Sequence, residues 1–143
     1  MGSFKKAIFR VLCLCCVLIG GGGLMAEPNP KELFDLGVES YKAKDYIQAE
    51  KYFEKACDLK YGGGCFRLGV LYEYGQGVEK NLTKAAQFYS KACDLNNGVG
   101  CKNLGFLYEY GEGVEKDLTK AAYFYSKACK LGSQEACEAL KEK

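Results

Sequence analysis

Residues 82–101 read LTKAAQFYSKACDLNNGVGC, and the pattern returns 36 residues later as LTKAAYFYSKACKLGSQEAC at residues 118–137. A weaker copy, YIQAEKYFEKACDLKYGGGC, stands earlier, at residues 46–65. Self-similarity at a period of roughly 20–50 residues is typical of repeat proteins, in which each unit buries its apolar face only by stacking on its neighbours. The sequence therefore predicts a stack of three similar units.

Apolar side chains within each unit recur at helical spacing. Between residues 82 and 93 they form one stripe, made of Leu82, Ala85, Ala86, Tyr89, Ala92 and Cys93. This spacing predicts a helix of about three turns. The residue in front of it is Asp45, Asn81 or Asp117 in the three units, and each side chain can accept hydrogen bonds from the first free N–H groups of the helix.

A second helix is predicted over Cys65–Tyr74 and again over Cys101–Tyr110. It ends at Gly75 and at Gly111, residues that suit a left-handed helix cap. A glycine also stands inside each copy, at positions 69 and 105, where it costs about 1 kcal/mol relative to alanine. We expect these inner glycines to let the paired helix approach closely.

The spacing of the units changes along the chain. The first unit resembles the tetratricopeptide repeat, and the residues that match that family are Leu36, Gly37, Ala49, Phe53 and Ala56. From glycine to alanine the step is 12 residues in this unit and 16 in the next, between Gly69 and Ala85. The later spacing resembles the Sel1-like repeat, with a longer loop inside each helix pair and a tighter turn between pairs.

Six cysteines form three pairs of identical spacing: Cys57/Cys65, Cys93/Cys101 and Cys129/Cys137. Each pair lies across the predicted turn between one helix pair and the next, so we predict three disulfides. Zinc is the alternative, but zinc-binding pairs usually stand two to four residues apart and often include histidine. The chain contains no histidine, so we expect no metal site.

The predicted fold is all-α, an α/α superhelix, or solenoid, of tetratricopeptide- or Sel1-like helix pairs with one disulfide per repeat. The repeat domain is expected to span residues 27–143. Its repeats are placed at about 30–61, 62–97 and 98–133, followed by a short polar capping helix at 133–143.

Residues 1–26 are predicted to be a signal peptide. Lys5, Lys6 and Arg10 precede the apolar run Val11–Ile19, which is too short to span a bilayer. Lipid attachment is the alternative for Cys13, Cys15 and Cys16, but these cysteines lack the small preceding residues of an acylation signal. An even six remaining cysteines fits a secreted or periplasmic protein.

The formal net charge of the chain is +2. Three positive charges fall in the predicted signal peptide and no acidic residue precedes Glu27, so the mature part carries about −1. A basic patch that could neutralise phosphates is not apparent, so we expect no nucleic-acid partner. We also expect no membrane span after signal removal.

The signal peptide, the 36-residue Sel1-like units and the Lys-Ala-Cys-Asp-Leu phrase together resemble the Helicobacter cysteine-rich protein family. The resemblance covers essentially the whole mature chain. It implies penicillin binding, recognition by the host immune system, and a β-lactamase that slowly hydrolyses 6-aminopenicillanic and 7-aminocephalosporanic acid derivatives. Relatives often carry more repeats, so a site built from those additional units would be lost here.

No catalytic motif supports the enzyme interpretation, so the catalytic residues are unknown and no cofactor is expected. The sole Ser-x-x-Lys runs from Ser3 to Lys6, inside the predicted signal peptide. Ser90 and Lys91 are adjacent, so on a helix they point about 100° apart. Glu73, Glu109, Tyr74 and Tyr110 stay open as general bases. Because these four recur from repeat to repeat, a structural role is the simpler interpretation.

A binding role has a clearer physical basis. In tetratricopeptide-like stacks the first helix of each pair lines a concave groove. The corresponding residues are Phe34, Val38, Phe66, Val70, Glu73, Tyr74, Lys102, Phe106, Glu109 and Tyr110. An aromatic and aliphatic floor edged by charges suits a peptide, a muropeptide, a β-lactam or a host protein. For each aromatic residue, packing between neighbouring helices is the alternative.

Overall fold

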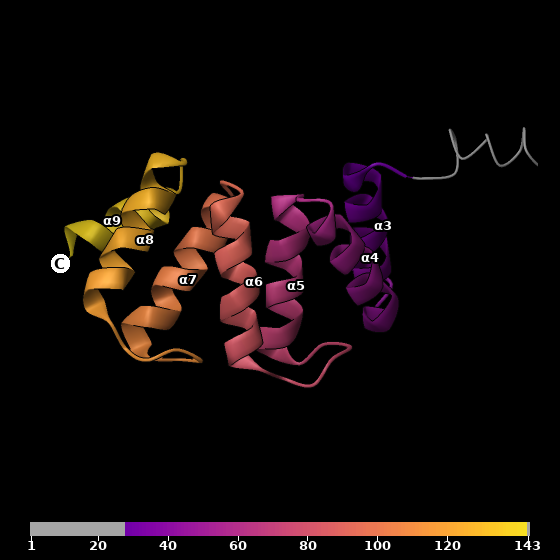
Figure 1. Ribbon diagram of the computed structural model, residues 1–143, viewed down its shortest axis with the longest axis horizontal. Coiled ribbons are helices and arrows are strands. Elements are labelled where there is room, and N and C mark those ends of the chain that lie inside the picture. Colours follow the sequence, from indigo (N-terminus) through magenta and orange to yellow (C-terminus); the bar gives the residue numbers. More distant parts are fainter. Residues whose placement is uncertain (1–27, 143) are drawn as a thin grey trace, which may run out of the picture.

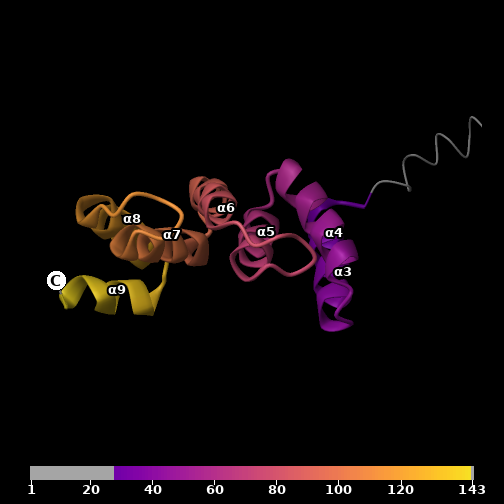
Figure 2. The same cartoon turned by 90° about the horizontal axis from the view of Figure 1, so that it is seen from below.

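The computed structural model describes residues 28–142, and the predicted signal peptide lies outside them. Seven helices follow one another in this part: α3 (Pro30–Lys42), α4 (Tyr46–Asp58), α5 (Gly62–Tyr74), α6 (Leu82–Asp94), α7 (Gly98–Tyr110), α8 (Leu118–Lys130) and α9 (Gln134–Lys141). They stack in chain order from α3 at one end to α9 at the other (Figures 1 and 2). The predicted all-α solenoid is confirmed. None of the described helices is both long and apolar enough to cross a membrane.

Loop lengths divide the stack into helix pairs. Residues 75–81 join α5 to α6 and residues 111–117 join α7 to α8, whereas only residues 59–61, 95–97 and 131–133 separate one pair from the next. The longer loop inside the second and third pairs and the tighter turn between pairs agree with the predicted Sel1-like geometry.

The ends of the helices follow the predicted signals. Asp45, Asn81 and Asp117 cap α4, α6 and α8, each accepting a backbone N–H at 3.0–3.1 Å from the residue three positions later. Gly75 and Gly111 cap α5 and α7 in the left-handed conformation, each with a φ of 66°. These assignments are confirmed because a short polar side chain and a residue without Cβ each solve a specific problem at a helix end.

The starts of α5 and α7 correct the predicted boundaries. These helices begin at Gly62 and Gly98, not at Cys65 and Cys101. Glycine has a low helix propensity, so propensity alone does not predict helix over the glycine-rich segments 62–64 and 98–100. Only residues 59–61 and 95–97 separate these helices from the preceding ones, so the glycines belong to the first turn of each helix. In α7 the side chain of Asn97 also caps this first turn.

Close helix contact inside each pair depends on the inner glycines. A Cβ placed on Gly69 would lie 2.6 Å from ring carbons of Tyr89, and one on Gly105 would lie 2.9 Å from Cδ1 of Tyr125. Tyr89 and Tyr125 are both buried. The predicted role of these glycines is therefore confirmed: each makes room for the tyrosine ring of the paired helix.

The three predicted disulfides are present. Cys57–Cys65, Cys93–Cys101 and Cys129–Cys137 have Cα–Cα separations of 4.6, 4.5 and 4.7 Å. They tie α4 to α5, α6 to α7 and α8 to α9, so every cross-link joins one helix pair to the next element of the stack.

The last helix, α9, ends the described stack. It is shorter than the predicted span 133–143, because Ser133 is its N-cap and the helix ends at Lys141; residue 143 lies outside the described part. Its exposed residues include Glu138, Lys141 and Glu142, as expected for a polar capping helix. Its inner residues Ala136, Ala139 and Leu140 pack with Tyr125 and Ala128 of α8.

Candidate functional site

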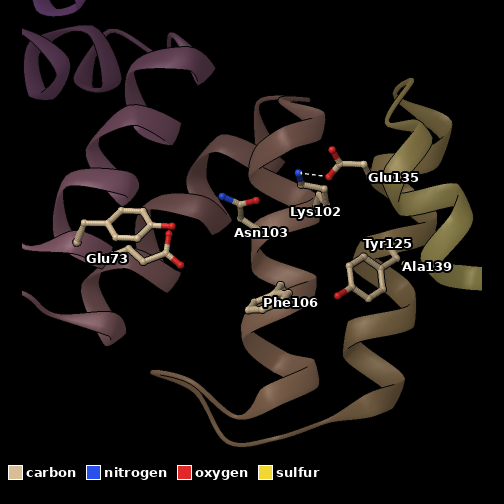
Figure 3. Close-up of a pocket in the computed structure, with 8 residues that line it drawn as sticks. Glu73, Lys102, Asn103, Phe106, Tyr125, Glu135 and Ala139 are labelled. Atoms are coloured by element: carbon tan, nitrogen blue, oxygen red, sulfur yellow. Dashed lines mark hydrogen bonds and ion pairs between the residues drawn. The ribbon is translucent and has the colours of Figure 1, made fainter. Parts of the chain in front are cut away.

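An open pocket of about 380 Å³ lies where α5, α7, α8 and α9 meet (Figure 3). Its lining residues are Glu73, Tyr74, Lys102, Asn103, Phe106, Tyr125, Glu135 and Ala139. Four helices thus contribute to one site. Volumes of roughly 300–1,000 Å³ are typical of small-ligand sites.

Helix α7 supplies the central wall, with Lys102, Asn103 and Phe106 on adjoining positions (Figure 3). The Phe106 side chain is 45% exposed, and its ring centroid lies 4.5 Å from that of Tyr110. Tyr74 at the end of α5 is 67% exposed. The pocket therefore presents aromatic surface to solvent beside polar groups.

One ion pair closes the side of the pocket nearest α9. Nζ of Lys102 donates to Oε2 of Glu135 at 2.6 Å (Figure 3). The hydrogen bond and the positive charge of Lys102 lower the pKa of the Glu135 carboxyl below its usual value. The Glu135 side chain is therefore charged at neutral pH, and α9 contributes a carboxylate to the rim of the pocket.

Two tyrosine–glutamate hydrogen bonds each involve one lining residue of the pocket, Glu73 in one and Tyr125 in the other. The hydroxyl of Tyr89 donates to Oε2 of Glu73 at 2.5 Å, and that of Tyr125 donates to Oε2 of Glu109 at 2.6 Å. Burial raises the pKa of both phenols above the usual value, and the bond to Glu73 raises that of Tyr89 further. Both tyrosines are therefore neutral donors that fix the position of a carboxylate.

The ten predicted groove residues separate into two groups. Glu73, Tyr74, Lys102 and Phe106 line the pocket. The remaining six lie outside its lining. Among these, Phe34, Val38, Phe66 and Val70 are half-buried and pack against the helix cores. Glu109 accepts the bond from Tyr125, and Tyr110 is exposed beside Phe106.

Four lining residues were not predicted: Asn103, Tyr125, Glu135 and Ala139. The groove prediction used only the first helix of each pair, so it could not include the second helix α8 or the capping helix α9. A usable signal was present, because Asn103 and Glu135 interrupt the repeat. The positions 36 residues earlier hold Arg67 and Val99.

The lining combines polar groups with aromatic surface. Its polar groups are two carboxylates, one ammonium, one amide and two phenols, and none of the lining residues is a serine, threonine or cysteine. Within residues 28–142, no group of three or more potential ligand side chains is arranged to hold a metal ion.

Sequence comparison identifies a repeat family and several named relatives. The Sel1 repeat family matches residues 33–61, 63–97 and 99–133. HcpC of Helicobacter pylori strain J99, which has a provisional beta-lactamase name, is 63% identical over 82 residues, covering 57% of this chain and 28% of HcpC. Beta-lactamase HcpA of the same strain is 55% identical over 84 residues, covering 59% of this chain and 33% of HcpA. The matched region is thus about a third or less of these relatives' length.

Solved structures share the architecture. Cysteine rich protein B of Helicobacter pylori superposes with a TM-score of 0.64 at 38% identity, covering 78% of this chain and 94% of that chain. The protein c5321, described as a protective antigen of uropathogenic Escherichia coli with an SLR fold, superposes with a TM-score of 0.75 at 27% identity, covering 78% of this chain and 25% of that one. Both have the stacked helix pairs described above.

Proposed function

Since the chain belongs to the Sel1 repeat family and is related to the Helicobacter cysteine-rich proteins, we propose that it is a secreted or periplasmic binding protein. Its pocket between α5, α7, α8 and α9 holds a peptide or a muropeptide- or penicillin-like molecule. A host protein is the larger alternative partner. Sel1 repeats are stacks whose extended surfaces suit such contacts.

The observation that carries this proposal is the aromatic surface left open at the pocket. Tyr74 and Phe106 are 67% and 45% exposed, and both line the pocket. Exposed aromatic side chains next to a few fixed polar groups are typical of contact surfaces, because they bury much apolar area with little loss of side-chain freedom. A bound ligand would cover this surface.

The location outside the cytoplasm is supported by the disulfides. Three cross-links in a small domain are characteristic of oxidising compartments. The predicted signal peptide points the same way, and mass spectrometry of the mature protein in culture fractions tests it. We expect a mature N-terminus near Glu27 and no reduced thiol.

Weak β-lactamase activity is a second candidate, favoured by the names of the matched relatives HcpA and HcpC. The pocket offers no serine nucleophile, so hydrolysis would need a water activated by a carboxylate such as Glu73. The carboxylate of Glu73 already accepts the hydrogen bond from Tyr89, so the oxygen that would activate a water is engaged. The geometry therefore favours binding without turnover.

Binding and turnover can be separated in one experiment on the oxidised protein. Benzylpenicillin and a muramyl dipeptide are titrated calorimetrically, and hydrolysis of a chromogenic cephalosporin is followed in parallel. We expect saturable binding with at least one of the two ligands and no turnover above buffer.

The variants for this experiment are Tyr74→Ala combined with Phe106→Ala, and Tyr123→Ala as the matched control. Tyr123 is as exposed as Tyr74 but lies outside the pocket. Binding should weaken at least tenfold in the double variant and stay unchanged in the control. Equal loss in both, or no binding by the wild-type protein, contradicts the proposal; turnover above buffer supports the enzyme candidate.

A further inference from the structure

The ion pair between Lys102 and Glu135 is unequal in its surroundings. The Lys102 side chain is only 27% exposed, whereas that of Glu135 is 77% exposed. The ammonium therefore stands inside the wall of the pocket, and the carboxylate that neutralises it approaches from solvent on α9. Exposed carboxylates contribute little to such pairs, because water solvates them almost as well.

Lys102 breaks the repeat pattern. Its counterpart 36 residues earlier is Phe66, whose ring stacks at 5.9 Å on Tyr89, and its counterpart 36 residues later is Glu138. A residue that only holds helices together is expected to recur, as the cysteines and the inner glycines do. A cation present in one unit of the stack marks a position with another task.

The surroundings of Lys102 define what it can recognise. Phe106 lies one helix turn further along α7 and Ala139 lines the same pocket from α9, so the pocket also offers apolar surface near Lys102, beside its polar groups (Figure 3). Glu73 stands on the opposite wall, on α5, where it would repel a second negative charge. Lys102 is the only cation among the lining residues. The site therefore suits one carboxylate next to an apolar group.

We propose that Lys102 binds the carboxylate of a small organic acid with an adjacent aromatic or aliphatic group, such as the C-terminal residue of a peptide. Glu135 occupies this position in the free protein as an internal substitute for that carboxylate. The ligand displaces Glu135 because its apolar group adds contacts with Phe106 and Ala139. This inference rests on the proposed binding function and names the chemistry of its ligand.

The test compares acids with their neutral counterparts on the full oxidised protein. N-acetyl-Ala-Phe and its C-terminal amide represent the peptide source, and benzylpenicillin and its methyl ester represent the β-lactam source. Affinities are measured by calorimetry for the wild-type protein, Lys102→Met, Glu135→Gln and the control Glu138→Gln. Glu138 is an exposed glutamate on α9, the helix that also carries Glu135, and it does not line the pocket. In the repeat it occupies the position of Lys102.

We expect Glu135→Gln to raise the affinity for at least one free acid about two- to fivefold, the range of an exposed ion pair, with its neutral counterpart unchanged. Lys102→Met should reduce the affinity for that acid to the level of the neutral counterpart. Glu138→Gln should change neither. Comparing the two acids then identifies the source of the carboxylate.

The other outcomes separate the two levels of the proposal. Equal binding of acids and neutral counterparts in every variant overturns the carboxylate inference and leaves the binding function intact. No binding of any compound to any variant removes both. A lower melting temperature of Glu135→Gln with no gain in acid affinity identifies the pair as a clamp for α9, and this too overturns the inference.

Discussion

The hydroxyl of Tyr89 donates a 2.5 Å hydrogen bond to Oε2 of Glu73, which lies 16 residues earlier on the paired helix. Tyr125 and Glu109 repeat this bond at 2.6 Å one unit later. In the first unit the tyrosine position holds Phe53, and the glutamate position, four residues after the inner glycine, holds Tyr41. Donor and acceptor are thus present together or absent together, as expected when a buried polar group must be paired.

Tyr89→Phe tests the strength of this bond. It leaves a half-buried carboxylate without its donor, so we expect the free energy of unfolding to fall by about 1.5 kcal/mol. Urea denaturation of Tyr89→Phe, Glu73→Gln and the double variant gives the coupling between the two residues. Tyr123→Phe on the exposed face should change stability by less than about 0.5 kcal/mol. A coupling below about 0.5 kcal/mol would show that the two residues act independently.

Stability should fall at alkaline pH. Folding raises the pKa of Tyr89 and Tyr125, mainly through burial, so the folded chain keeps these phenol protons after the unfolded chain has lost them. The stabilising contribution is complete below the ordinary tyrosine pKa of about 10 and is lost as the pH rises above it. Urea midpoints from pH 8 to 11 and absorbance at 295 nm measure this. The variant Tyr89→Phe with Tyr125→Phe should show a shallower decline; an unchanged slope contradicts the assignment.

Gly69→Ala should destabilise the second helix pair. Its Cβ would lie 2.6 Å from ring carbons of Tyr89 and 3.3 Å from the carbonyl oxygen of Ala85. Overpacking of this kind costs about 1–3 kcal/mol, which exceeds the gain in helix propensity of about 1 kcal/mol. Gly98→Ala is the matched control, because its nearest neighbour is the Leu131 Cβ at 3.3 Å. Thermal denaturation should rank Gly69→Ala as the less stable variant, and the reverse order would refute the close-packing role.

The disulfide at the end of the stack should have a specific effect on the pocket. Replacing Cys129 and Cys137 by serine removes a loop closure worth about 2.5 kcal/mol. Helix α9 packs on one side only, so this change should also release Glu135 and Ala139 from the pocket wall. Hydrogen exchange should show lost protection in α9. The control, Cys93→Ser with Cys101→Ser, should lose similar stability while keeping α9 protected; equal exchange of α9 in both variants contradicts this view.

Much of the fold could be predicted from the sequence, because helix caps and disulfides depend on residues that are close together in the chain. Each of these features acts within a few residues: the helix caps Asp45, Asn81 and Asp117, the left-handed Gly75 and the cysteine pairs. The helix starts at Gly62 and Gly98 were missed, since propensity alone argues against glycine in a first turn. Left-handed backbone at Lys60, with a φ of 65°, was likewise not predicted, because lysine rarely adopts this conformation.

The candidate site was less accessible, because it depends on contacts between distant segments. Lys102 and Glu135 are 33 residues apart, and no periodic pattern brings them together. Their pairing follows from the turn at 131–133, which folds α9 back beside α7 and α8. Phe66 and Lys102 occupy the same repeat position, yet one packs against Tyr89 and the other lines the pocket. The repeat position therefore predicts on which side of the helix a residue lies, but not whether a neighbouring helix covers its side chain.

The placement of the three cross-links also determines how the chain responds to proteases. A cut at Lys60 falls between Cys57 and Cys65, so both fragments would stay covalently joined. A cut at Lys80 or Lys116, in the loops within helix pairs, falls inside no cross-linked segment and divides the protein. Proteolysis at the narrow turns therefore leaves one covalently joined molecule, whereas proteolysis at the wide loops separates it into pieces.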